Sequence, residues 1–304
     1  MILLTGATGL IGSALLQRLL DTGADVRCLV RDPRRLGPNR VRVHITLGDL
    51  ADPVAIRQAV RGTETVVHLG AAIRDEPTAS IEEVTSLATI RLLRDAERAG
   101  VGRFLFFSAI GATPSSRTRF FRAKALAERA ALAADLDVRV VAPSIVYAPG
   151  DPWLTLLGRM MLLPWMPVVG SGRARFEPIW AEDVAACAMA LLNGSSSAGR
   201  GRLELAGPEQ LTYEQIVKVA MEASGRRRPL VHVPLQAVRR GLGLLERIAG
   251  PAVFATWEEA ELLEESMTSE RGVADARGLG VEPTPMREVL GLSDAQAYRG
   301  QPPR

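Results

Sequence analysis

The chain has 304 residues, of which 47% are hydrophobic and 23% are charged, and its formal net charge is +3. This length can form one large α/β domain with an appended lobe, and the composition is typical of a globular protein. Its basic residues occur in short runs, whereas nucleic-acid binding requires a concentrated basic face. The two cysteines and three histidines are scattered, so they predict neither a disulfide framework nor a metal site.

Two features bear on localisation. No basic region precedes an apolar stretch at the first residues, which argues against a signal peptide. The longest apolar stretch, residues 153–169, is interrupted by glycine, arginine and proline, so it cannot form an ordinary membrane-spanning helix. We therefore expect a cytoplasmic protein without a transmembrane segment.

A glycine motif follows the first apolar residues. Residues 1–4 predict a buried strand, and Gly6, Gly9 and Gly12 then form a G-x-x-G-x-x-G turn before a helical apolar pattern at 13–20. Glycine lets the backbone turn tightly and approach a pyrophosphate, whose charge is met by amide groups at the helix N-terminus. The motif therefore predicts a dinucleotide site; the alternative is a turn that only packs strand against helix.

Strand-like and helix-like segments then alternate, which predicts a Rossmann-type, doubly wound parallel sheet with helices on both faces. Further strands are expected at 26–30, 41–47, 65–69, 103–107, 138–142 and 203–206. Helices are expected at 53–60, 81–99, 124–134 and 181–192.

The composition and the apolar patterning of the chain change from residue 147 onward. Residues 147–180 are rich in Pro, Gly, Trp and Met, and residues 209–292 carry mainly helical patterning. We expect an NADP-binding Rossmann domain from residues 1–146 with about 181–208. A smaller, mainly helical C-terminal lobe for substrate or partner is expected from 147–180 with 209–292. Residues 293–304 are polar and predict a flexible tail.

The ends of the second, third and fourth predicted strands carry residues suited to a dinucleotide. Arg31 stands where an acidic side chain would bind the adenosine ribose, and its planar guanidinium suits a 2′-phosphate, which favours NADP over NAD. Asp49 could face the adenine amino group, and Leu69, Gly70 and Ala71 are compact enough for a dinucleotide to pass. The alternatives are a solvated loop at Arg31 and tight surface turns at the other two positions.

These motifs occur in order together with Ser108, the run Pro143–Tyr147 and the run Phe176–Val184. Over residues 1 to about 290 the chain resembles the extended and atypical short-chain dehydrogenase/reductase superfamily. Within it, the chain is similar to the NADPH-binding accessory subunit of respiratory complex I and to epimerase-like NAD(P)-binding proteins. The resemblance implies the following cofactor-binding residues: Gly6, Thr8, Gly9, Leu10, Ile11, Gly12, Arg31, Asp49, Leu50, Leu69, Gly70, Ala71, Ser108, Lys124, Pro143 and Ile145.

The catalytic pair of that superfamily is Tyr-x-x-x-Lys, in which the lysine binds the nicotinamide ribose and lowers the tyrosine pKa. This chain keeps Lys124 but has Phe120 in the tyrosine position. Ser108 aligns with the start of the family's serine cluster, but Ala109 and Ile110 follow it. Because the chain has only two lysines, the retention of Lys124 favours a functional role; the alternative is an exposed helix lysine.

Two functions remain open. The first is an NADPH-dependent reductase or isomerase acting on an apolar small molecule, with Lys124 or Tyr147 as the acid/base. The second is a non-catalytic NADP-binding structural subunit or redox-sensing regulator with a protein partner. Apolar residues of the lobe, such as Trp153 and Trp165, could line a lipophilic pocket, pack the lobe against the sheet, or face a partner or a bilayer surface.

Overall fold

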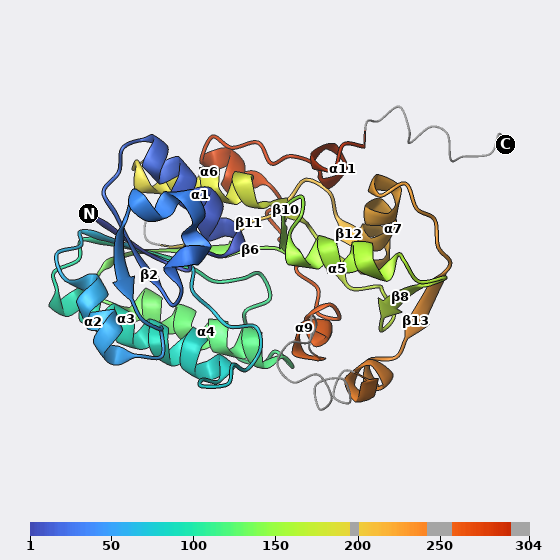
Figure 1. The fold of residues 1–304 in the computed structure, drawn as a ribbon, viewed down its shortest axis with the longest axis horizontal. Coiled ribbons are helices and arrows are strands. Elements are labelled where there is room, and N and C mark those ends of the chain that lie inside the picture. The colour runs from blue at the N-terminus through green and yellow to red at the C-terminus, as the bar shows by residue number, and fades with distance from the viewer. Residues whose placement is uncertain (195–200, 242–256, 293–304) are drawn as a thin grey trace.

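The computed structural model describes residues 1–194, 201–241 and 257–292. Its main sheet has seven parallel strands in the order β11-β6-β5-β4-β1-β2-β3 (Figure 1). These strands are β1 (Ile2–Thr5), β2 (Val26–Val30), β3 (His44–Leu47), β4 (Thr65–His68), β5 (Arg103–Phe107), β6 (Asp137–Pro143) and β11 (Gly201–Leu205). Strand β1 lies between β2 and β4, so the strand order reverses at the carboxyl end of β1, where open α/β sheets bind their ligands. The predicted fold class is confirmed.

Helices cover both faces of the sheet because their apolar residues recur every three or four positions. One face carries α1 (Leu10–Asp21), α6 (Ala181–Leu192) and α10 (Ala274–Gly278); the other carries α2 (Pro53–Val60), α3 (Ala88–Arg98) and α4 (Arg119–Ala133) (Figure 1). Cys28 of β2 and Cys187 of α6 lie in the first layer, where burial raises the pKa of each thiol to about 12.

The remaining elements form a second unit around an apolar cluster that includes Tyr147 and Phe176 and that Phe121 of α4 also enters. Its helices are α5 (Pro152–Met160), α7 (Tyr213–Ala223), α9 (Trp257–Leu262) and α11 (Met286–Val289). Its strands pair as β7 (Val146–Tyr147) with β10 (Ile179–Trp180), β9 (Arg175–Phe176) with β12 (Leu211–Thr212), and β8 (Met166–Val169) with β13 (Leu230–Val233). In the described residues, no helix is long and apolar enough to cross a membrane.

Several predicted boundaries differ from the structure for local reasons. Strand β3 starts at His44 because residues 33–41 form a 3-10 helix, η1 (Pro33–Val41). Helix α4 starts at Arg119, five residues before the predicted start, because the Thr118 side chain caps its N-terminus. The predicted helix over 81–99 contains a π-helical turn, η2 (Glu83–Leu87), ahead of α3.

The division into a Rossmann domain and a lobe stays a prediction, with one difference in detail. Residues 274–281 were assigned to the lobe, but Ala276 and Leu279 pack with Leu203 and Leu205 of β11 in the core of the main sheet. The predicted flexible tail, 293–304, lies outside the described residues.

Candidate functional site

The glycine turn between β1 and α1 is shaped by the absence of side chains. Gly6 has φ 74°, and a Cβ added to it would lie 2.8 Å from the Gly70 amide nitrogen. A Cβ on Gly12 would lie 2.0 Å from the Gly6 carbonyl oxygen, so the first turn of α1 packs directly on the loop backbone. This close contact between backbone segments holds the strand-to-helix turn in a shape that lets its amide groups reach a ligand.

In the described part of the chain, no side chain caps the N-terminus of α1 by a hydrogen bond. Gly9 is the N-cap residue and supplies no side chain, and the first turn holds no acidic residue. The amide groups that no side chain caps and the positive end of the helix dipole therefore suit an anion such as a pyrophosphate. Thr8, Leu10 and Ile11 lie in the same turn. These residues fit a dinucleotide.

The other predicted cofactor residues gather at the same edge of the sheet, because each follows the carboxyl end of a parallel strand. Gly70 meets the glycine turn and Leu50: a Cβ on Gly70 would lie 2.3 Å from Leu50 Cδ1. The remaining residues of this set are Arg31 after β2, Asp49 after β3, Leu69 and Ala71 after β4, Ser108 after β5, and Pro143 and Ile145 at the end of β6. Their contact with a cofactor stays a prediction.

Arg31 is held by carboxylates at this edge. Its guanidinium donates to Glu76 and lies 3.6 Å from an Asp49 oxygen, while 55% of its side chain remains exposed. Asp49 also accepts a hydrogen bond from the Ala51 amide. A 2′-phosphate would therefore compete with Glu76 for the guanidinium.

His68 is a fully buried residue of the core. Its Nε2 lies 2.8 Å from the Thr89 hydroxyl, which itself donates to the Thr85 carbonyl, so Nε2 carries the ring proton. Nδ1 then accepts from the Thr5 hydroxyl at 2.6 Å, and Thr5 accepts from the Gly70 amide. Burial, followed by the charge of Lys124, lowers the pKa of His68 to about 3, so the ring is neutral.

Lys124 projects from α4 into the core and is only 4% exposed, which excludes the exposed-helix alternative. Its Nζ donates to the Phe107 carbonyl at 2.6 Å and lies 5.2 and 5.8 Å from the centroids of the Phe106 and Phe120 rings. Burial lowers the pKa of Lys124 to about 7, partly offset by the charge of Glu128. The amine can therefore exchange a proton near neutral pH.

The other candidate acid/base, Tyr147, has a different environment. It is fully buried in the apolar cluster of the second unit, and its hydroxyl has no hydrogen-bond partner among the described residues. Burial, with the charges of Glu209 and Asp183, raises the pKa of its phenol, which makes it a poor proton donor at neutral pH. Its catalytic role stays an untested expectation.

One group that the sequence did not single out completes this region. Glu128 lies one helical turn after Lys124; it accepts from the Ser108 hydroxyl at 2.5 Å and pairs with Arg202 at 2.9 Å. Arg202 also pairs with Glu204 of β11. The spacing Lys124-x-x-x-Glu128 places both charges on one face of a helix, which was the signal available in the sequence.

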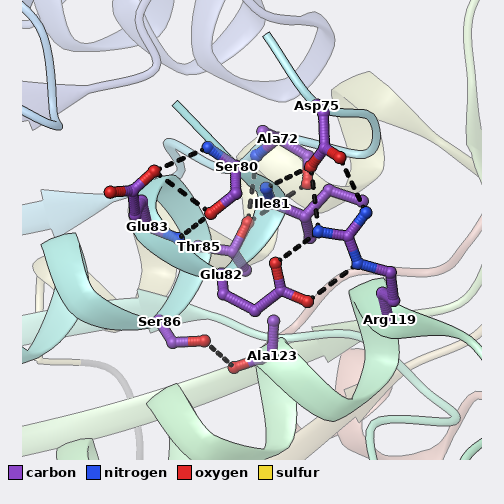
Figure 2. A network of polar contacts seen from close by, with 10 residues as sticks. All are labelled: Ala72, Asp75, Ser80, Ile81, Glu82, Glu83, Thr85, Ser86, Arg119 and Ala123. Carbon is purple, nitrogen blue, oxygen red and sulfur yellow. Dashed lines mark hydrogen bonds and ion pairs between the residues drawn. The ribbon is translucent and has the colours of Figure 1, made fainter. Parts of the chain in front are cut away.

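A second missed group fixes the loop after β4 to the start of α4. Figure 2 shows Arg119 between two carboxylates: it bonds Asp75 at 2.7 and 3.0 Å and Glu82 at 2.9 and 2.6 Å. Asp75 also accepts from the Ile81 amide, and the Ser86 hydroxyl donates to the Ala123 carbonyl. Because Arg119 precedes Phe120, this clamp fixes the residues around the missing tyrosine.

A small pocket opens beside Phe120. Its lining combines the loop after β4, the start of α4 and helix α9 of the second unit: Ile73, Ile81, Thr118, Arg119, Phe120, Glu258, Glu261 and Leu262. The wall is mixed, with apolar side chains beside carboxylates. Burial raises the pKa of Glu261, with the positive charges of Arg122 and Arg239 opposing the rise.

Comparison with known proteins agrees with this geometry. Residues 6–152 match a family model described as NAD(P)H-binding. The ceramide reductase of Caulobacter vibrioides is 28% identical over 272 residues, which cover 87% of this chain and 84% of that protein. Subunit 9 of the NADH dehydrogenase [ubiquinone] 1 alpha subcomplex of Arabidopsis thaliana mitochondria is 28% identical over 226 residues, covering 70% of this chain and 55% of that one.

The fold is also shared with solved structures. A nucleoside-diphosphate-sugar epimerase from Staphylococcus aureus superimposes with a TM-score of 0.75 at 18% identity, over 95% of this chain and 99% of that one. The chain therefore contains an NAD(P)H-binding domain with a reductase- and epimerase-like fold. The predicted resemblance to the atypical and extended short-chain dehydrogenase/reductases is confirmed.

Proposed function

We propose that this NAD(P)H-binding relative of the atypical short-chain dehydrogenase/reductases is an NADP(H)-dependent reductase or isomerase of an apolar small molecule. The observation that carries the proposal is Lys124, a buried amine beside the tyrosine position, with a pKa lowered to about 7. A purely structural role does not explain why the charge of this lysine is removed from water. A group that transfers a proton, in contrast, needs a pKa near the working pH.

The roles of the chain's own groups follow from their places. The glycine turn and the N-terminus of α1 would hold the pyrophosphate, and Arg31 the 2′-phosphate. When bound, the nicotinamide supplies or accepts the hydride. The Lys124 amine would orient a ribose hydroxyl and hold or release a proton, while the Phe107 carbonyl fixes its position.

An apolar substrate is supported mainly by a relative, because the pocket beside Phe120 is small and only part of its wall is apolar. Ile73, Phe120 and Leu262 give one part of the wall beside Phe120 an apolar character. The relative from Caulobacter vibrioides is named for reduction of a ceramide, a lipid-like molecule, and it spans most of this chain. Reduction is the direction that this name favours over isomerisation.

Conversion of Phe120 to tyrosine tests the proposal. Phe120→Tyr restores a phenol one helical turn from Lys124, and general acid catalysis contributes about 10²–10⁴-fold in rate. We expect the parent to oxidise NADPH very slowly with quinones or diketones and the variant to be measurably faster. The double variant Phe120→Tyr/Lys124→Met should lose the gain. A parent as fast as ordinary carbonyl reductases would show that a group already present donates the proton without a tyrosine, and Lys124→Met in the parent would then show whether that group is Lys124.

The second candidate is an NADP-binding structural subunit or redox-sensing regulator. Phe120 and Ile110 occupy the positions where the resemblance implies a catalytic tyrosine and a polar partner, and one relative is named as a subunit of NADH dehydrogenase. If Phe120→Tyr still binds NADPH but gains no activity, this role is favoured over the reductase.

A further inference from the structure

Large apolar side chains are exposed at one end of the molecule, away from the main sheet. Leu162, Leu163 and Trp165, in the turn between α5 and β8, are 67%, 44% and 40% exposed, and Val231 of β13 is 42% exposed. Figure 1 shows this turn and the connection from α7 to β13 meeting at the end of the second unit. Contiguous exposed apolar residues of this size mark interaction surfaces.

The backbone explains why these side chains point outward. Strands β8 and β13 form a ribbon in which Met166 and Val168 are fully buried. Because side chains alternate along a strand, Trp165 and Pro167 lie on the opposite, outer face. Val231 pairs with Pro167 and shares that face.

Arginines stand close in the chain to the residues of this apolar face. The segment Arg226–Arg228 follows α7, and the Arg228 side chain donates to the Leu163 carbonyl at 2.9 Å, which fixes the two segments side by side. Arg159 stands in the last turn of α5, and Arg159, Arg226 and Arg227 are all exposed. Neither Arg159 nor Arg226 forms an ion pair within the part of the chain that the structure describes.

Two acidic residues of α7 are paired with basic residues in the described structure. Glu222, at the end of α7, forms a two-bond ion pair with Arg287, and Glu214, at its start, pairs with Lys218 and His232. The face therefore combines exposed leucines, a tryptophan and excess positive charge.

We propose that this end of the molecule docks on the surface of an anionic lipid bilayer. The leucines of the turn enter the boundary between head groups and acyl chains, Trp165 lies at the head-group level, and the arginines contact lipid phosphates. Exposed leucines, a tryptophan and exposed arginines on one face match the three successive depths of a membrane interface: the acyl boundary, the head-group level and the lipid phosphates. The inference goes beyond the proposed function and does not depend on catalysis.

Vesicle co-sedimentation of the full chain tests the docking. We expect binding to phosphatidylcholine vesicles that contain phosphatidylglycerol, little binding to phosphatidylcholine alone, and weaker binding as salt is raised. Arg226→Gln/Arg227→Gln should weaken partitioning roughly twenty-fivefold, because each basic residue near an anionic surface contributes about fivefold. Leu162→Ser/Trp165→Ser should also weaken binding of the protein to the anionic vesicles.

Matched controls use similar residues elsewhere. Val41→Ser/Leu47→Ser removes apolar side chains that are 84% and 65% exposed, and Arg57→Gln/Arg129→Gln removes two exposed arginines; both variants should bind like the parent. The fluorescence of the parent should shift to shorter wavelength on anionic vesicles, and Trp165→Phe should abolish the shift.

Three outcomes would overturn the proposal. They are absence of binding to anionic vesicles, equal binding to both vesicle types, and binding that the control variants weaken as much as the test variants. Self-association in analytical ultracentrifugation that Leu162→Ser/Trp165→Ser abolishes, without vesicle binding, would assign the face to a second copy of the chain instead.

Discussion

Lys124 illustrates at the residue scale how a fold changes the chemistry of one group. Its ammonium has lost most of its water and receives one carbonyl and two ring faces in exchange. Those contacts favour the charged form, yet desolvation is the larger effect, and the pKa falls to about 7 from 10.5. A buried cation of this kind lowers the stability of the fold, which favours a functional role for Lys124.

The first prediction concerns that cost. Between pH 7 and 10.5 the unfolded chain binds the Lys124 proton more strongly than the folded protein does, so the contribution of Lys124 to stability rises with pH. Its destabilising effect is complete below about pH 7. Urea unfolding should show Lys124→Met gaining on the parent by up to about 1.4 kcal/mol for each pH unit from 9 down to 7. Lys218→Met, at an exposed lysine, should show no such trend; a pH-independent difference at Lys124 would contradict the lowered pKa.

Arg31 carries the second prediction. Its bond to Glu76 must be exchanged for a phosphate if it selects NADP. Glu76→Gln should therefore strengthen NADPH binding and leave NADH binding nearly unchanged, whereas Arg31→Asp should reverse the preference. A charge-assisted hydrogen bond is worth about 1.5–3 kcal/mol, or about ten- to hundredfold in affinity.

Fluorescence titration with both cofactors measures this preference. The control is Arg34→Gln, because Arg34 is 83% exposed and pairs with Asp32 instead. Equal affinities of the parent for NADPH and NADH would remove Arg31 as the selecting residue.

At the scale of elements, the Arg119 clamp joins the loop after β4 to α4 (Figure 2). Hydrogen bonds from Arg119 lower the pKa of Asp75 and of Glu82, so the stabilisation is present above the ordinary carboxyl range and is lost as pH falls through the lowered values. Asp75 and Glu82 are 47% and 45% exposed, so each pair contributes at most about 1 kcal/mol.

The third prediction is that the clamp controls local order more than global stability. Arg119→Met should speed hydrogen exchange in residues 72–86 at pH 7 and leave the strands of the main sheet protected. Arg98→Met, which removes an exposed pair with Asp95, should leave residues 72–86 unchanged. Equal acceleration throughout the chain would instead indicate a global role for Arg119.

The elements also separate what a sequence can predict from what it cannot. The strands of the main sheet and helices α2 and α6 were predicted because their apolar periodicity is local. The three two-stranded ribbons were missed because their partners lie far apart in the chain: β8 pairs with β13 from residue 230 onward. Helix α4 starts earlier than predicted because Thr118 caps its N-terminus, although aromatic residues follow this cap.

The candidate site shows the same limit. Glycines and strand ends placed most predicted residues at one sheet edge, since parallel strands end together. The burial of Lys124, however, depends on Phe106 of a neighbouring strand. Arg119 meets carboxylates 44 and 37 residues away, a pairing that no spacing rule specifies.

At the scale of the whole molecule, binding of NADPH should raise the stability of the folded protein. A ligand at 100 times its dissociation constant stabilises the folded state by about 2.7 kcal/mol, so NADPH should raise the melting temperature by several degrees. Gly9→Asp should abolish this rise, because a carboxylate at the N-cap repels a pyrophosphate.

The same substitution should leave the fold intact. Gly9 has φ −83° and ψ 176°, which any residue can adopt. A Cβ there would lie 3.2 Å from the Gly6 carbonyl oxygen, so the turn has to shift slightly to accept it. Aspartate is a better N-cap than glycine by a few tenths of a kcal/mol, which offsets part of that cost. Gly9→Ser, which caps without a charge, should keep part of the NADPH effect. A full NADPH-dependent rise in Gly9→Asp would show that the cofactor does not use this turn.

The packing of residues 274–281 against the main sheet has a consequence for how the protein folds during its synthesis. Strand β11 is the edge of that sheet; Asp275 accepts the Glu204 amide, and Ala276 and Leu279 cover the apolar side chains of the strand. During synthesis β11 leaves the ribosome before residues 274–281, so this edge of the sheet stays uncovered until that later segment follows. Chaperone contact is therefore expected to matter most in the interval between the completion of β11 and the arrival of α10.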